Sequence, residues 1–118
     1  MRYVLAALMA LHGIAHLVGF VGSWNLGPPA PAVPYKTTVL AGHVDLGDVG
    51  IRVVGVLWLA AAIAFVVTAV GAAMNAEWWM RMALVVTLGS LALTVLEWPL
   101  ARIGLYVDVA LLGAILLV

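Results

Sequence analysis

Apolar residues dominate the chain in four long runs, separated by one long and two short segments that contain polar residues, proline and glycine. The runs cover residues 3–21, 53–73, 79–97 and 100–118. Each has about the 20 residues that a helix needs to cross the hydrocarbon core of a bilayer. The pattern predicts an all-α integral membrane protein, a four-transmembrane-helix bundle with up-down-up-down topology, multi-pass in the cell membrane.

We expect the helices at about residues 3–22, 48–73, 78–98 and 100–118, within a single domain that covers residues 1–118. One long connection, residues 23–47, joins the first two helices. Its first part, Gly27–Pro34, is rich in proline and is expected to be extended. The part from Tyr35 onward mixes apolar and polar side chains, so we expect it to fold down over the mouth of the bundle.

The amino-acid composition limits the kinds of molecule that the protein is expected to bind. Hydrophobic residues make up 67% of the 118 residues and charged residues 8%, and the formal net charge is zero. Nucleic-acid binding needs clustered Lys and Arg, which this sequence lacks. The expected partners are therefore the lipid bilayer, a lipophilic small molecule, and either a second copy of the chain or a larger membrane complex. The chain has no cysteine, which excludes disulfides and thiolate metal sites.

His12 and His16 are the two histidines inside the first apolar run. Their spacing of four places both imidazoles on one face of a helix. An ionisable side chain within a bilayer is costly and usually faces a partner or a cavity inside the protein. The pair is therefore the first candidate for a functional site. A structural role, ligand or proton chemistry and a metal site all stay open, but a metal would need a third ligand, and we assign no metal and no cofactor.

Depth along the helices predicts which residues meet. His16 lies six residues from Gly22, and Asp108 lies six residues from Arg102, which places each about 9 Å inside the same mouth. His12 lies about 15 Å inside it. We therefore expect His16 to pair with Asp108 and His12 to mark the floor of the site.

A polar stripe on the third helix completes the candidate site. Its members, Thr87, Ser90, Thr94 and Glu97, follow one another at spacings of three, four and three. Together with the charged residues at the mouth they predict a polar column inside the bundle. The candidate ligand-binding residues are His12, His16, Arg52, Ser90, Thr94, Glu97, Arg102 and Asp108.

The segment Leu11-His-Gly-Ile-Ala-His-Leu-Val-Gly-Phe20 resembles the first helix of DoxX-like four-helix membrane proteins, in which a similar H-G-x-x-K-L-x-G run occurs. His16 stands where that run has lysine. The layout that includes Asp48, Arg52, Trp98-Pro99 and Arg102 also resembles small uncharacterised four-helix membrane proteins of high-GC bacteria. The resemblance implies a four-helix membrane fold and brings no activity with it.

Three functions are compatible with these observations. The first is a membrane protein that binds a small or amphiphilic ligand in a polar intramembrane cavity, or an accessory subunit of a membrane complex. The second is a membrane-embedded isomerase, hydrolase or epoxide-opening cyclase, with Asp108, His16 and Glu97 as catalytic acids and bases. The third is a proton-coupled transporter that works as a dimer. The sequence leaves open whether the protein is an enzyme.

Overall fold

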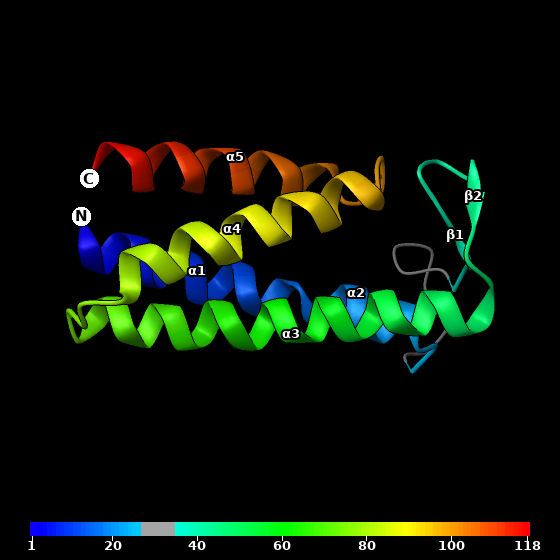
Figure 1. Cartoon of the computed structure of the whole chain (residues 1–118), viewed down its shortest axis with the longest axis horizontal. Helices are drawn as coiled ribbons and strands as arrows, with labels where there is room; N and C mark the ends of the chain where they lie inside the picture. The colour runs from blue at the N-terminus through cyan, green and yellow to red at the C-terminus, as the bar shows by residue number, and fades with distance from the viewer. Residues whose placement is uncertain (27–34) are drawn as a thin grey trace.

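The computed structural model describes residues 1–26 and 35–118, which are mostly helical (Figure 1). The predicted extended segment Gly27–Pro34 lies outside the described residues. The helices are α1 (Arg2–Ala15), α2 (Leu17–Ser23), α3 (Gly47–Ala73), α4 (Trp79–Leu96) and α5 (Arg102–Leu117). Two short strands, β1 (Thr38–Val39) and β2 (Val44–Asp45), precede α3.

Three helices are long and apolar enough to cross a membrane. They are Arg2–Ser23, which joins α1 and α2, then Gly47–Ala73 and Trp79–Leu96. The last helix, α5, has 16 residues and is the shortest of the four expected helices. The structure therefore confirms a mostly helical chain in which three helices have the length and hydropathy needed to cross a membrane.

The first expected helix is interrupted at His16, between α1 and α2. The backbone N–H of His16 is shared between the carbonyls of His12 and Gly13, at 3.2 and 3.1 Å. The Gly19 N–H then donates to the His16 carbonyl three residues back, at 3.1 Å, which is the tighter hydrogen-bonding pattern of a 3₁₀ turn. The interruption therefore falls on one of the two histidines of the candidate site.

Helices that follow one another in sequence lie side by side. The joined α1 and α2 pack along α3, α3 packs on α4, and α4 packs on α5, while both chain termini lie at the same end (Figure 1). Gly13 lets α1 approach α3 closely, because a Cβ atom there would lie 2.7 Å from Phe65 Cβ and 3.0 Å from the Ala62 carbonyl oxygen. The apolar core beside this contact contains Leu5, Met9, Phe65, Ala83 and Leu111.

The connection before α3 folds down onto the end of α4, as expected, but it does so as a β-hairpin, which the all-α expectation lacked. Thr38 pairs with Asp45 and Val39 with Val44 in an antiparallel register. The turn donates the backbone N–H of Leu40 to the Leu96 carbonyl at 2.8 Å and that of Ala41 to the Trp98 carbonyl at 3.1 Å. Carbonyls at the end of a helix lack partners within the helix. The hairpin therefore supplies one hydrogen-bond donor to the end of α4 and a second one to the turn that follows it.

Asp45 links the hairpin to the start of α3. Its carboxylate accepts a hydrogen bond from the backbone N–H of Gly47, the first residue of α3, at 3.0 Å. This bond is the main cause that lowers the pKa of Asp45 below its usual value. A negative charge at this position also suits the positive end of the helix dipole. The hairpin thus places an anionic group where α3 begins.

We expect Gly13→Ala to destabilise the protein by about 1–3 kcal/mol, because the added methyl group overlaps the backbone and side chain of α3. The measurement is the free energy of unfolding in detergent micelles. Gly89→Ala on α4 is the matched control, since its added Cβ meets nothing within 4 Å among the described residues. Replacing a helical glycine by alanine should then stabilise the protein slightly. Equal effects of the two substitutions would contradict the close contact at Gly13.

Candidate functional site

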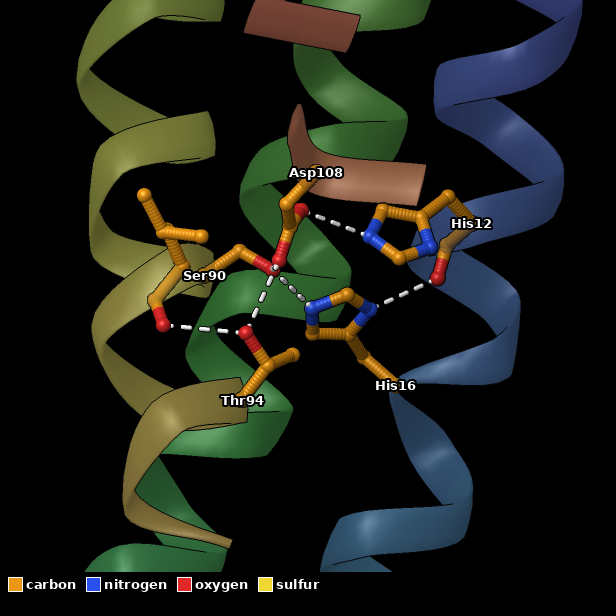
Figure 2. Close-up of polar contacts among 6 residues, drawn as sticks. His12, His16, Ser90, Thr94 and Asp108 are labelled. Atoms are coloured by element: carbon orange, nitrogen blue, oxygen red, sulfur yellow. Dashed lines mark hydrogen bonds and ion pairs between the residues drawn. The ribbon is translucent and has the colours of Figure 1, made fainter. Parts of the chain in front are cut away.

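Asp108 on α5 is the centre of a buried polar network (Figure 2). Its side chain is fully buried. One carboxyl oxygen, Oδ1, lies 2.8 Å from Nε2 of His12 on α1. The other, Oδ2, lies 2.8 Å from Oγ of Ser90 on α4. The residue therefore joins three helices through hydrogen bonds at the middle of the apolar bundle.

His16 extends the network through Ser90. Its Nε2 lies 2.6 Å from the Ser90 hydroxyl oxygen, and its Nδ1 lies 2.7 Å from the backbone carbonyl oxygen of His12. A carbonyl oxygen can only accept, so Nδ1 of His16 carries a hydrogen and donates it. The two imidazoles meet edge to face with ring centroids 4.5 Å apart, and Phe65 lies 5.1 Å from each. Both nitrogens of His16 are thus engaged within the protein.

The structure corrects the expected pairing. His12, not His16, contacts Asp108 directly, and His16 reaches it through Ser90. The depth estimate assumed that α2 ends and α5 begins at the same level. In Figure 1, α2 and α3 extend beyond the corner between α4 and α5. Because α5 begins deeper, Asp108 lies level with the residue one helical turn further along α1.

The hydroxyls of the α4 stripe have different roles. Thr94 donates to the Leu91 carbonyl of its own helix at 2.9 Å and lies 3.4 Å from Asp108 Oδ2. Thr87 is fully buried, but its hydroxyl has no hydrogen-bond partner within residues 1–26 and 35–118. Ser90 is therefore the member of the stripe that completes the network, and Thr87 lies outside it.

A cavity of about 650 Å³ lies against this network. His12, His16 and Thr94 supply polar side chains to its wall, and Lys36 and Glu97 line it at the hairpin side. Asp108 and Ser90 are not among the lining residues, so the histidines lie between them and the cavity. The remaining lining residues are mainly apolar or small and come from α1, α2, the first half of α3, the turn between α4 and α5, and α5.

Exposed apolar side chains form part of the cavity's lining. Leu11 on α1, Val18 on α2 and Ile103 on α5 all line it, although each is more than half exposed, at 66%, 53% and 73%. Residues that are both exposed and cavity-lining mark the rim. The cavity therefore opens to the side, between the first and last helices, where the outer surface is apolar.

Trp58 on α3 forms the wall behind His16 and had no role assigned from the sequence. Its ring centroid lies 5.0 Å from that of His16. Gly19 lies against the face of the indole, since a Cβ atom there would be 2.5 Å from Trp58 Cδ2. The indole nitrogen is buried without a hydrogen-bond partner in the described part of the chain. One feature of the sequence does distinguish Trp58: it lies well inside its predicted helix, whereas the other tryptophans lie near predicted helix ends.

The two arginines expected at the mouth do not join the network or line its cavity. Ile51 lines the cavity, and the next residue on a helix is turned about 100° away, so Arg52 faces elsewhere. Its guanidinium lies 5.5 Å from the ring centroid of Trp24. Arg102 is exposed at the start of α5. Of the expected charged residues at the mouth, only Glu97 lines the cavity.

A second, smaller pocket of about 330 Å³ lies beside Arg52. The Tyr35 hydroxyl donates to the Asp48 carboxylate at its wall, and this hydrogen bond is the main cause that raises the pKa of Tyr35 above its usual value. His43 in the hairpin is exposed and donates from Nδ1 to the Leu40 carbonyl. Within the described residues, no group of three or more His, Asp or Glu side chains is close enough to hold a metal ion.

We expect Ser90→Ala to cost about 1–3 kcal/mol of stability, because it leaves both His16 Nε2 and Asp108 Oδ2 without their shared partner. Thr87→Val on the same helix is the matched control. Its hydroxyl is equally buried but makes no hydrogen bond in the described chain, so its removal should leave stability unchanged or raise it. Unfolding in detergent micelles measures both. A tolerated Ser90→Ala would show that the network does not hold the helices together.

Comparison of the chain with protein-family models, with curated proteins and with solved structures finds no match. The resemblance of the first helix to DoxX-like proteins therefore stays a prediction, and the function has to be argued from the residues of this chain.

Proposed function

We propose that the chain is a multi-pass membrane protein, an up-down-up-down four-helix bundle, that binds a lipophilic small molecule in the cavity beside His12 and His16. Three helices of sufficient length and hydropathy support the membrane assignment. So does the outer surface, where many large apolar side chains are exposed, including Leu11, Val53, Ile63, Val85 and Ile103. Exposure on this scale suits contact with lipid rather than water.

The cavity is the observation that carries the binding proposal. Its volume of about 650 Å³ lies within the range of small-molecule sites, roughly 300–1,000 Å³. Its lining also follows the usual composition of such sites, with an apolar majority and a few polar groups that fix the orientation of the ligand. The apolar part suits a hydrocarbon chain, and the wall formed by His12, His16 and Thr94 suits a polar end group.

The sideways opening supports a ligand that arrives from the bilayer. The rim residues Leu11, Val18 and Ile103 are apolar and lie on helices that would face lipid. A lipophilic molecule dissolved in the membrane could pass between them without entering water. At the hairpin side, Lys36 and Glu97 supply charge near the proposed membrane surface.

The test is photo-crosslinking in lipid nanodiscs with two long-chain alkyl diazirines, one with a terminal hydroxyl and one with a terminal methyl ketone. We expect at least one probe to label cavity-lining residues of α1, α2 or α5, identified by mass spectrometry of the digested protein. Ala15 lines the cavity, so Ala15→Phe should fill part of it and reduce the labelling severalfold.

Ala60→Phe is the matched control, because Ala60 is exposed on α3 and is not among the lining residues. It should leave cavity labelling unchanged. Labelling spread over the whole lipid-facing surface, with no reduction by Ala15→Phe, would show that the cavity is not a binding site.

A further inference from the structure

If both histidines are neutral and Asp108 is ionised, the network has too few hydrogen atoms for all of its hydrogen bonds. Nδ1 of His16 must donate to the His12 carbonyl, which leaves Nε2 of a neutral His16 as an acceptor. Asp108 Oδ2, when ionised, is also an acceptor. Ser90 lies between them, 2.6 Å from one and 2.8 Å from the other, and has a single hydroxyl hydrogen to donate. One further hydrogen must lie on the path from Asp108 to His16.

Two arrangements supply that hydrogen and leave the network without net charge. In the first, Asp108 is a neutral acid that donates to Ser90, and Ser90 donates to His16. In the second, His16 is an imidazolium that donates to Ser90, and Ser90 donates to the Asp108 carboxylate. The two contain the same number of hydrogens and differ by a shift of two protons along the path. Burial of net charge at this depth would be costly, which favours both over a charged network.

Both arrangements leave His12 in the same state. In each, His12 is neutral and donates its Nε2 hydrogen to Asp108 Oδ1, across 2.8 Å. A neutral imidazole carries one hydrogen, so Nδ1 of His12 is then an acceptor. If His12 were instead the cation beside an Asp108 carboxylate, a neutral network would need a neutral His16, and either the His16–Ser90 contact or the Ser90–Asp108 contact would lack a hydrogen. A network without net charge therefore has a neutral His12.

Nδ1 of His12 is free to meet a ligand. It makes no hydrogen bond in residues 1–26 and 35–118, yet it is not one of the fully buried atoms that lack a partner. His12 also lines the cavity. On the facing helix α5, Gly104 has no side chain beside this ring, and a Cβ atom there would lie 3.9 Å from His12 Cε1.

We propose that His12 Nδ1 accepts a hydrogen bond from the ligand and that the ligand is a lipophilic alcohol, with its hydroxyl at His12 and its hydrocarbon chain in the apolar part of the cavity. This inference rests on the proposed ligand-binding function. A ketone, ester or ether of the same chain length has only acceptors to offer, so it meets a lone pair at Nδ1 and binds more weakly.

The test is competition against photo-labelling of the cavity by the two diazirine probes. The competitors are dodecan-1-ol and dodecan-2-one, added at equal membrane concentration to nanodiscs that contain the full chain. We expect dodecan-1-ol to compete about three- to tenfold better, the ratio that one net hydrogen bond supplies. The wild-type comparison alone tests the proposal and does not depend on the folding of any variant.

His12→Gln tests the assignment to this nitrogen. The glutamine amide N–H₂ can take the place of Nε2–H as the donor to Asp108. The amide oxygen then branches from the side of the former ring that carried Cδ2, away from the Nδ1 edge, so the acceptor at Nδ1 is lost. We expect the preference for the alcohol to fall to about onefold. Thr94→Val tests the competing acceptor in the cavity wall, because the Thr94 hydroxyl donates to Leu91 but its oxygen still has lone pairs. Thr87→Val is the control, because Thr87 is buried on the same helix and is not among the lining residues. The alcohol preference should persist in the control.

Each outcome separates this inference from the proposed function. If neither probe labels the cavity, the binding function itself fails. If both probes label it and the two competitors are equally effective, the cavity binds ligands but the acceptor role of His12 is overturned. A preference for the alcohol that persists in His12→Gln and is lost in Thr94→Val places the acceptor at the threonine, which also overturns the proposal. A preference that persists in both His12→Gln and Thr94→Val also overturns the proposal.

Discussion

A carboxyl group in the middle of an apolar helix bundle has to be given hydrogen-bond partners, and the arrangement of this protein follows from how Asp108 obtains them. An unpaired buried polar group or charge costs several kcal/mol. Asp108 avoids this cost through His12 and Ser90, from two other helices. Their positions set the relative heights of α1, α4 and α5, because a shift of one helical turn would break the contacts.

The same network gives the two histidines different properties. His16 lines the cavity, but its nitrogens are occupied by a backbone carbonyl and by Ser90. It therefore presents ring carbon rather than a free nitrogen to the space beside it. His12 has one nitrogen bound to Asp108 and another without a partner in the described chain. Two identical side chains, one turn apart on one helix face, thus differ because of the partner that each finds on another helix.

The sequence indicated five polar side chains that face the interior of the bundle but not how they pair. Helical periodicity and the cost of polar groups in lipid identified His12, His16, Ser90, Thr94 and Asp108 as residues that face the interior, and the structure brings all five together. Pairing depends on the axial offset between helices. That offset arises from the corner between α4 and α5 and from the hairpin bound to it. Neither is encoded in the periodicity of the helices.

The charged residues at the mouth show a second reason why prediction is incomplete. Arg52 and Glu97 were both assigned to one polar column, but only Glu97 lines the cavity. Near the ends of helices a long side chain can turn either inward or toward a neighbouring loop. Arg52 stacks on Trp24, whose indole N–H in turn donates to the Arg52 carbonyl at 2.9 Å. This local pairing of two neighbouring residues determined its direction, and spacing along the helix could not reveal it.

The hydrogen bond between His12 and Asp108 has a consequence for biogenesis, because its two residues are 96 positions apart. The first helix is synthesised long before the last one, and its buried imidazole has no carboxyl partner until α5 is in place. The chain therefore closes its polar network only after α5 has been synthesised. Until then the space between the first and last helices stays open, and the same boundary later becomes the side through which the cavity opens.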